Sequence, residues 1–328
     1  IFVLLPIHKE IGGYMGFDLN NLNQFPYPDS RKYSSARSAF LDLLRNLEIE
    51  SIWMPKFICD TMLKPLEILK INIKFYDLDI NFYPKTPFEL EKNDYLLYVN
   101  YFGICTQNQE KLASLYPRDK IIFDHSQAFF VEPFWGTHTI YSPRKFFAIA
   151  DGGLLVTEND VRAVDTLHHE DELIEQYKHL FIRSISCAQQ GYMQFQKAEA
   201  ILNDCIPKKI SPITELILKN INYSNFKERR LNNFEYLHSK LGKFNQLNIC
   251  LEKLESPLTY PFLSNKKYSE YLIKHKIFIT TYWNDCLARI SNNSVEYQFV
   301  NGITHLVCDH RYGIDDMQFQ IDIIEKVM

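Results

Sequence analysis

Tyr141-Ser142-Pro143-Arg144-Lys145-Phe146-Phe147 is followed by Asp151-Gly152-Gly153 and by a short apolar run, Leu154-Leu155-Val156. One lysine thus stands between a strand-like segment and a glycine pair, downstream of Phe123-Asp124-His125-Ser126-Gln127. An amine on a flexible stem can form a Schiff base with an aldehyde, and an apolar surround makes it nucleophilic by disfavouring its charged form. The aromatic residues within the stretch predict such a surround for Lys145.

The composition indicates a globular chain that is not built for nucleic acid or for a membrane. Its 328 residues, 46% of them apolar, suffice for one large domain and a smaller one. The net charge is -4 with both signs interspersed, so neither a nucleic acid nor a membrane is expected as a partner. Seven cysteines without C-x-x-C pairs argue against disulfides and structural zinc, so we expect no metal site. With no targeting signal and an apolar start, Ile1 to Ile7, too short to span a bilayer, we expect a cytoplasmic protein.

Helical periodicity alternates with short β-rich runs from about Tyr33 to Thr157, which is typical of an α/β fold with a mostly parallel sheet. The expected strands are Ser51–Met54, Ile73–Tyr76, Tyr95–Tyr101, Lys120–Asp124, His138–Ser142 and Leu154–Thr157. The expected helices are Ala36–Leu47, Cys59–Ile68 and Gln107–Tyr116. Because functional groups of such sheets gather at the carboxyl ends of strands, Asp124 is well placed for a site.

The second half of the chain has a different pattern. The segment from Val161 to about Lys240 predicts mostly helix, with a break at Ile206-Pro207 and a stop after Leu241-Gly242. Further on we expect strands at Thr259–Leu263, Ile277–Tyr282 and Ile303–Cys308, a helix near Tyr268–His275 and a last helix from Asp315. The prediction is a large domain over residues 1–240 and a small C-terminal α+β domain over residues 241–328.

Five further segments join Lys145 in a family resemblance that is strong from Ser34 to Thr157 and weak from Gly12 to the C-terminus. They are Ser34-Ser35-Ala36-Arg37-Ser38-Ala39, Met54-Pro55, Tyr76-Asp77-Leu78-Asp79, Val99-Asn100-Tyr101-Phe102-Gly103 and Phe123-Asp124-His125-Ser126-Gln127. In this combination the chain resembles the DegT/DnrJ/EryC1/StrS family of pyridoxal phosphate-dependent sugar aminotransferases. The resemblance implies fold type I, the architecture of aspartate aminotransferase.

The resemblance also implies a role for each matched residue. Lys145 would carry the cofactor as a Schiff base and then act as general base and acid. Asp124 would keep the pyridine nitrogen protonated, and Gln127 would lie beside the ring's phenolic oxygen. The phosphate would be held at the helix start by Ala36 and Arg37 and by the hydroxyl of Ser142.

Each of these residues also has a purely structural interpretation. Asp124 and Ser142 would then be turn residues, Gln127 a buried amide bonded to the backbone, and Ser34 and Ser35 ordinary N-caps.

The sequence departs from the family pattern at three places. Ile140 replaces a serine that usually lies five residues before the lysine, and Lys208-Lys209-Ile210-Ser211 gives no clear counterpart of the family's NyRm element. Cys59 stands where the family often has an aromatic residue stacked on the cofactor. We therefore expect that Phe57 or Tyr101 covers the ring instead, or that this face of the cofactor site differs.

The function that the resemblance implies is amino transfer from an amino acid, glutamate, to the keto group of a nucleotide-linked sugar, for surface polysaccharide. The enzyme would be a cytoplasmic homodimer with small-molecule substrates. Two alternatives stay open: a pyridoxal phosphate-dependent sugar dehydratase and a non-catalytic member of the fold. From the residues alone, Asp77 and Asp79 also fit the metal-binding acid pair of a glycosyltransferase, and 168–172, with two adjacent histidines, predicts a solvated helix face.

Overall fold

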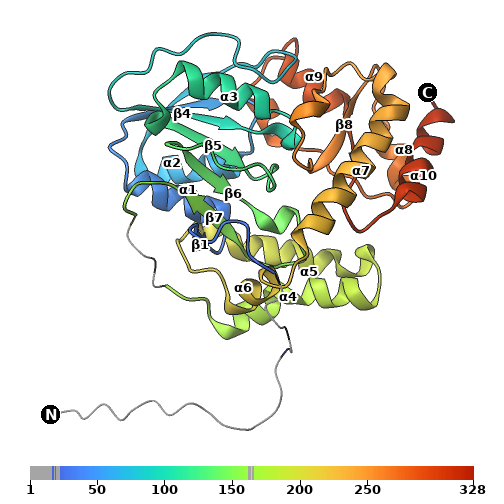
Figure 1. Cartoon of the computed structure of the whole chain (residues 1–328), viewed down its shortest axis with the longest axis horizontal. Coiled ribbons are helices and arrows are strands. Elements are labelled where there is room, and N and C mark those ends of the chain that lie inside the picture. Colours follow the sequence, from blue (N-terminus) through green and yellow to red (C-terminus); the bar gives the residue numbers. More distant parts are fainter. Residues whose placement is uncertain (1–16, 18, 20–22, 162–163, 165) are drawn as a thin grey trace, which may run out of the picture.

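A seven-stranded mixed sheet forms the centre of the larger part of the molecule (Figure 1). The structure is a computed structural model that describes residues 17, 19, 23–161, 164 and 166–328. Residues 1–16, and with them the weak resemblance at Gly12 and the Ile1 to Ile7 segment, lie outside the described residues. No helix within the described ranges has the length and apolar character that a bilayer span needs.

The strand order of this sheet is β1-β7-β6-β5-β4-β2-β3. All six predicted strands are present: β2 Ser51–Pro55, β3 Asn72–Tyr76, β4 Asp94–Val99, β5 Ile121–His125, β6 His138–Tyr141 and β7 Gly153–Val156. The short edge strand β1, Arg31–Tyr33, was not among the predicted strands. β7 is antiparallel to both of its neighbours, and the other pairs are parallel. The predicted α/β class with a mostly parallel sheet is confirmed.

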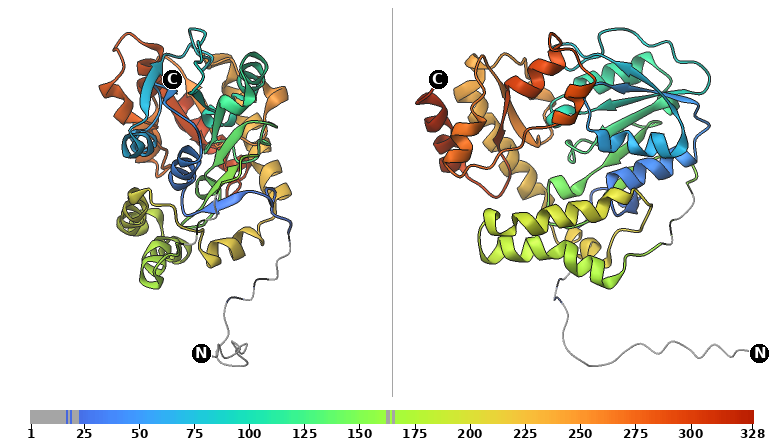
Figure 2. Two further views of the ribbon diagram at one scale, coloured as in Figure 1. Left: turned by 90° about the vertical axis from the view of Figure 1, so that its left-hand side faces the viewer. Right: turned by 180° about the vertical axis from the view of Figure 1, so that it is seen from behind.

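Helices cover both faces of the sheet, with α1 and α2 on one face and α3 on the other (Figure 2). Their bounds are α1 Ala36–Arg45, α2 Lys64–Leu69 and α3 Thr106–Leu115. The single helix expected over Cys59–Ile68 is instead split into a 3-10 turn, Asp60–Met62, and α2. Pro65 explains the split, because proline has no N–H and fits only the first turn of a helix, so that α2 begins beside it.

The helical region between the two sheets contains α4 Glu170–Ile185, α5 Ala188–Ile201, α6 Pro212–Leu218 and α7 Tyr223–Leu241. α4 and α5 lie side by side as a hairpin (Figure 2). The break predicted at Ile206-Pro207 is confirmed, and α7 leads from the large sheet to the C-terminal elements (Figure 1). The remaining short 3-10 turns are Tyr101–Gly103, Arg118–Lys120, Pro143–Lys145, Leu202–Asp204, Gly242–Phe244, Leu251–Lys253 and Asn284–Ala288.

The C-terminal part is built on two antiparallel strands, β8 Thr259–Leu263 and β9 Ile303–Val307. Helices α8 Ser269–Lys274, α9 Val295–Gly302 and α10 Ile314–Glu325 accompany them. The expected strand Ile277–Tyr282 is wrong, because this segment pairs with no strand in the described structure. Its β-like pattern reflects half-burial of alternate apolar residues against the core, which a coil segment can also satisfy.

All seven cysteines are free thiols, and four of them, Cys105, Cys205, Cys286 and Cys308, are buried.

Candidate active site

A pocket of about 260 Å³ lies where β4 and β5 end, at the carboxyl edge of the parallel strands. Seven predicted site residues line it together: Ala36, Arg37, Cys59, Asp124, Gln127, Ser142 and Lys145. They come from four separate stretches of chain, and the parallel strands bring the strand-end residues among them to one edge. Phe57 and Tyr101, the two residues expected to cover the ring, do not line this pocket.

Asp124 is the next-to-last residue of β5 and is only 4% exposed. Its Oδ1 accepts a hydrogen bond from the Ser126 N–H at 2.8 Å, which is the turn-capping contact that a structural role predicts. Within the described residues no donor binds Oδ2. One carboxylate oxygen thus fixes the turn, and the other is available to a ligand.

Gln127 is fully buried, and its two amide atoms differ in their environment. Oε1 accepts a hydrogen bond from the Phe102 N–H at 2.9 Å, whereas Nε2 has no partner among the described residues. A buried donor without an acceptor costs free energy, about 1–3 kcal/mol, so a partner from outside the protein would stabilise it. Because Gln127 lines the pocket, an acceptor oxygen on a ligand would satisfy it.

Lys145 ends the 3-10 turn Pro143–Lys145, and its N–H donates to the Ser142 carbonyl at 3.1 Å. The lysine lines the pocket but is exposed, so the expected aromatic surround is wrong. Phe146 and Phe147 instead pack in a separate core cluster with Phe129. The turn explains the difference, since with about three residues per turn successive side chains point in different directions.

The helix that begins at the pocket is α1. Ser35 caps this helix, its Oγ accepting from the Ser38 N–H at 3.1 Å, so the N-cap interpretation of Ser35 is confirmed. The first-turn N–H groups of a helix have no intrahelical acceptors and favour an anion. Ala36 and Arg37, in that turn, line the pocket together with Ser142, which directly follows β6.

The glycine pair allows strand β7 to lie directly against this helix start. The Gly152 N–H donates to the Ser34 carbonyl at 2.7 Å, and Gly152 has a φ of 136° that favours glycine. A Cβ at Gly153 would lie 2.1 Å from the Ser35 carbonyl carbon and 2.3 Å from the Ala36 nitrogen. Only glycine fits there, so Asp151-Gly152-Gly153 shapes the helix side of the pocket.

Neither Phe57 nor Tyr101 is in a position to cover a ligand ring, which corrects the prediction. Both are buried, neither lines the pocket, and their rings stack on one another at 5.5 Å. The Tyr101 hydroxyl donates to the Phe57 carbonyl at 3.0 Å, which locks the pair into the core. Their apolar bulk fits that core better than an open pocket.

Cys59 does line the pocket, and its Sγ lies 3.0 Å from the Thr61 hydroxyl oxygen. Burial raises the pKa of this thiol, although the positive charge of Lys145 and the Thr61 contact lower it in part. A protonated, buried thiol is a weak nucleophile and a small wall residue.

Several lining residues were missed by the sequence analysis. Glu199 of α5 forms an ion pair with Arg144, and the Asn203 side-chain oxygen accepts from Arg37 at 2.7 Å. Trp283 reaches the same pocket from the C-terminal half. None of these residues stands in a recognisable motif, and only the folded chain brings them to the strand ends.

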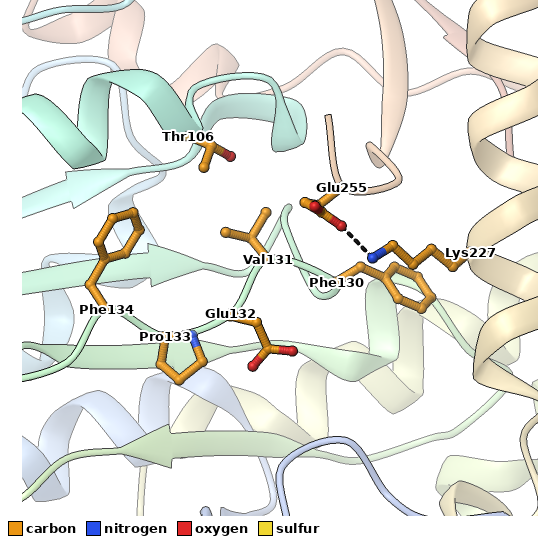
Figure 3. A pocket seen from close by; sticks show the side chains of 8 residues that line it. All are labelled: Thr106, Phe130, Val131, Glu132, Pro133, Phe134, Lys227 and Glu255. Carbon is orange, nitrogen blue, oxygen red and sulfur yellow. Dashed lines mark ion pairs between the residues drawn. The ribbon is translucent and has the colours of Figure 1, made fainter. Parts of the chain in front are cut away.

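A second hollow of about 310 Å³ lies between the loop after β5 and α7 (Figure 3). Lys227 and Glu255 form an ion pair at one side of it, and Phe130 and Phe134 contribute apolar walls (Figure 3). It shares no lining residue with the Lys145 pocket and contains none of the predicted site residues.

Asp77 and Asp79, the pair that also fits a metal-binding site, are held by contacts within the protein. Asp77 pairs with Lys56 at 2.9 Å, and Asp79 accepts from the Asn81 and Tyr83 N–H groups at 2.8 and 2.9 Å. In the described ranges no three His, Cys, Asp or Glu side chains group as metal ligands.

At His168 the structure differs from the solvated helix face expected for residues 168–172. It precedes α4, and its side chain is 2% exposed, 3.5 Å from the buried carboxylate of Asp151.

The chain matches no family model, and no relative is found among curated proteins. Solved structures are similar in fold. The sugar aminotransferase CalS13 from Micromonospora echinospora is 12% identical with a TM-score of 0.58, covering 91% of this chain and 87% of CalS13. A DegT DnrJ EryC1 StrS aminotransferase from Brucella abortus is 12% identical with a TM-score of 0.56, covering 90% and 85%.

A third similar structure has a different activity. The E. coli GDP-4-keto-6-deoxy-D-mannose-3-dehydratase with bound hydrated PLP is 15% identical with a TM-score of 0.55, covering 90% of this chain and 87% of that one. The structural neighbours thus include a sugar aminotransferase, a DegT-type aminotransferase and a sugar dehydratase with bound PLP. The resemblance and the fold type I architecture inferred from the sequence are confirmed at the level of the fold.

Proposed function

We propose that this protein is a pyridoxal phosphate-dependent aminotransferase that moves an amino group from an amino acid, glutamate, to the keto group of a nucleotide-linked sugar. One observation carries the proposal. Lys145, the buried carboxylate of Asp124 and the unpaired Nε2 of Gln127 line a single pocket at the carboxyl ends of parallel strands. The fold shared with PLP-dependent sugar enzymes supports it.

The residues present fit the cofactor. When bound, pyridoxal phosphate supplies an aldehyde carbon that amines attack and a ring that takes up the electron pair of a broken bond. Asp124 Oδ2 would accept a hydrogen bond from the ring nitrogen and keep it protonated. Gln127 Nε2 would donate to an oxygen on the ring and thereby find the acceptor that the protein itself does not supply.

The start of α1 suits the phosphate. The first-turn N–H groups at Ala36 and Arg37 and the hydroxyl of Ser142 are donors that a phosphate anion accepts. The guanidinium of Arg37 adds positive charge there while it stays bound to Asn203.

Lys145 Nζ would hold the cofactor and then move a proton. The amine is accessible in the pocket, as attack on an aldehyde carbon requires. Once an incoming amine has released it, Nζ would take the proton from the substrate carbon that bears nitrogen. It would then return this proton to the carbon that was the cofactor's aldehyde carbon.

Other features of the proposal rest on the family resemblance. They are a cytoplasmic homodimer, a role in surface polysaccharide synthesis, and a division into a cofactor domain over residues 1–240 and a small domain over residues 241–328. The fold of the E. coli dehydratase makes sugar dehydration the second candidate. Its product would have lost water and gained no nitrogen.

The test is covalent capture of the cofactor. Protein incubated with pyridoxal phosphate should turn yellow, and borohydride should fix the cofactor on the peptide that contains Lys145. Lys145→Ala is the matched control and should give no such peptide. An unmodified Lys145 peptide after reduction would contradict the proposal. A screen of keto-sugar nucleotides with glutamate, read by cofactor colour and product mass, then separates amination from dehydration.

A further inference from the structure

Trp283 is the aromatic side chain that reaches the candidate active site from the C-terminal half. It lines the pocket together with Cys59 and Lys145, although it lies more than a hundred residues further along the chain. Its ring packs edge-on against Phe57 at 4.7 Å and Tyr101 at 5.5 Å. These two buried residues support the indole, which is itself only half-buried.

The backbone at Trp283 is in a conformation that bulky residues rarely adopt. Its φ is 57° and its ψ is 43°, in the left-handed region. Such a conformation costs free energy and persists only where the surroundings hold it, which is common at ligand sites.

The segment that follows Trp283 is fastened to the loop that carries Cys59. The Arg289 guanidinium donates to the Lys56 carbonyl at 2.9 Å and also binds the Ile58 carbonyl and Asp60. The Asp285 carboxylate accepts from the Asp60 N–H at 2.6 Å. These contacts fix the two segments against one another, and Cys59 and Trp283, one from each segment, both line the pocket.

We propose that Trp283 supplies the aromatic contact to the cofactor ring that residue 59 lacks in this protein. A thiol leaves room that an aromatic residue at position 59 would fill, and the indole enters the pocket beside it. Trp283 is therefore a cofactor-binding residue from the C-terminal half. Because this assignment rests on the proposed function, its tests measure cofactor binding and tryptophan emission rather than turnover.

The first test compares pyridoxal phosphate affinities by absorbance titration. Trp283→Leu should weaken binding about three- to tenfold, the equivalent of about 0.5–1.5 kcal/mol for a lost aromatic contact, and Trp283→Phe should keep most of the affinity. In the Trp283→Leu background, Cys59→Phe should restore affinity by returning an aromatic ring to the pocket. An unchanged dissociation constant in Trp283→Leu would overturn the assignment.

The second test reads tryptophan emission, and its main arm keeps Trp283 intact. The chain has three tryptophans, and energy transfer from indole to the bound cofactor falls steeply with distance. With Trp53→Phe and Trp135→Phe combined, only Trp283 emits, and the cofactor should quench nearly all emission. With Trp135→Phe and Trp283→Phe combined, only Trp53 emits, and a smaller fraction should be lost.

The outcomes distinguish the two proposals. Equal quenching of Trp53 and Trp283 would overturn the role of Trp283 while leaving the cofactor in place. A protein that neither binds pyridoxal phosphate nor loses tryptophan emission in its presence would overturn the proposed function and this assignment together.

Discussion

The residues that line the Lys145 pocket form two sets, its two sides in terms of origin along the chain, and the two sets are built in different ways. One side consists of strand ends, a turn and a helix start, with Asp124, Lys145 and Ala36 each inside a short recognisable stretch. The other side consists of Trp283, Glu199 and Asn203, which come from a C-terminal coil and a helical hairpin. The comparison teaches that local sequence patterns encode the first side, whereas long-range packing assembles the second.

Contacts behind Lys145 are also non-local. Arg230 of α7 is 2% exposed and donates to the Phe146 carbonyl, just after Lys145, at 3.4 Å. The same guanidinium donates to the Pro257 carbonyl at 3.4 Å, in the C-terminal half. A buried arginine with several donors can thus join segments that are far apart in sequence.

The largest effect is expected on the motif-encoded side. Asp124→Asn should keep the cofactor bound but slow the half-reaction with glutamate by about 10²–10³-fold, because a neutral partner no longer holds the ring nitrogen protonated. Stopped-flow absorbance of the loaded protein measures this rate. Asp160→Asn, which changes an exposed carboxylate outside the pocket, is the control and should react normally. Unchanged turnover in Asp124→Asn would remove Asp124 from its role.

A smaller effect is expected where β7 meets the start of α1. Gly153→Ala places a Cβ 2.1 Å from the Ser35 carbonyl carbon, so the backbone must shift and the free energy of unfolding should fall by about 1–3 kcal/mol. Urea unfolding measures the loss. Gly313→Ala is the matched control, because nothing lies within 4 Å of its Cβ. Equal stability of the two variants would mean that the glycine pair does not shape this side.

Over a single pH unit the C-terminal half should show the smallest effect, as a pH dependence of stability. Burial lowers the pKa of His305 to about 3, and His125, in β5, has a pKa lowered by burial to about 3 as well. Since unfolded histidine binds its proton near pH 6.5, the unfolded state binds more protons between pH 6.5 and 3. Stability is therefore complete above pH 6.5 and falls on acidification, by about 1.4 kcal/mol per pH unit for each group.

His305→Phe separates the two contributions. It removes one titrating group, so the slope of unfolding free energy between pH 6 and pH 5 should decrease by about 1.4 kcal/mol per pH unit. His275→Gln alters an exposed ring and should keep the full slope. If both variants behave alike, the histidine of the C-terminal half is not held neutral by burial.

Much of the fold could be predicted from the sequence. Six strands of the large sheet and helices α1 and α3 follow from period and composition, with end residues shifted by only a few positions. The edge strand β1 was missed because three residues give too little pattern. The segment Ile277–Tyr282 was misread because alternating half-burial gives the same pattern in a strand and in a coil.

For the candidate site, the sequence by itself determined which chemical groups the strand ends and the helix start contribute: Lys145, Asp124, Gln127, Ser142 and the first turn of α1. The tertiary structure alone decided that Phe146 and Phe147 turn away from the lysine, that Tyr101 stays in the core and that Trp283 enters the pocket. The physical reason is the separation along the sequence between the residues that determine each feature. Strand ends and caps depend on neighbours within a few residues, whereas the direction of a side chain and the wall that it meets depend on packing between segments that are distant in sequence.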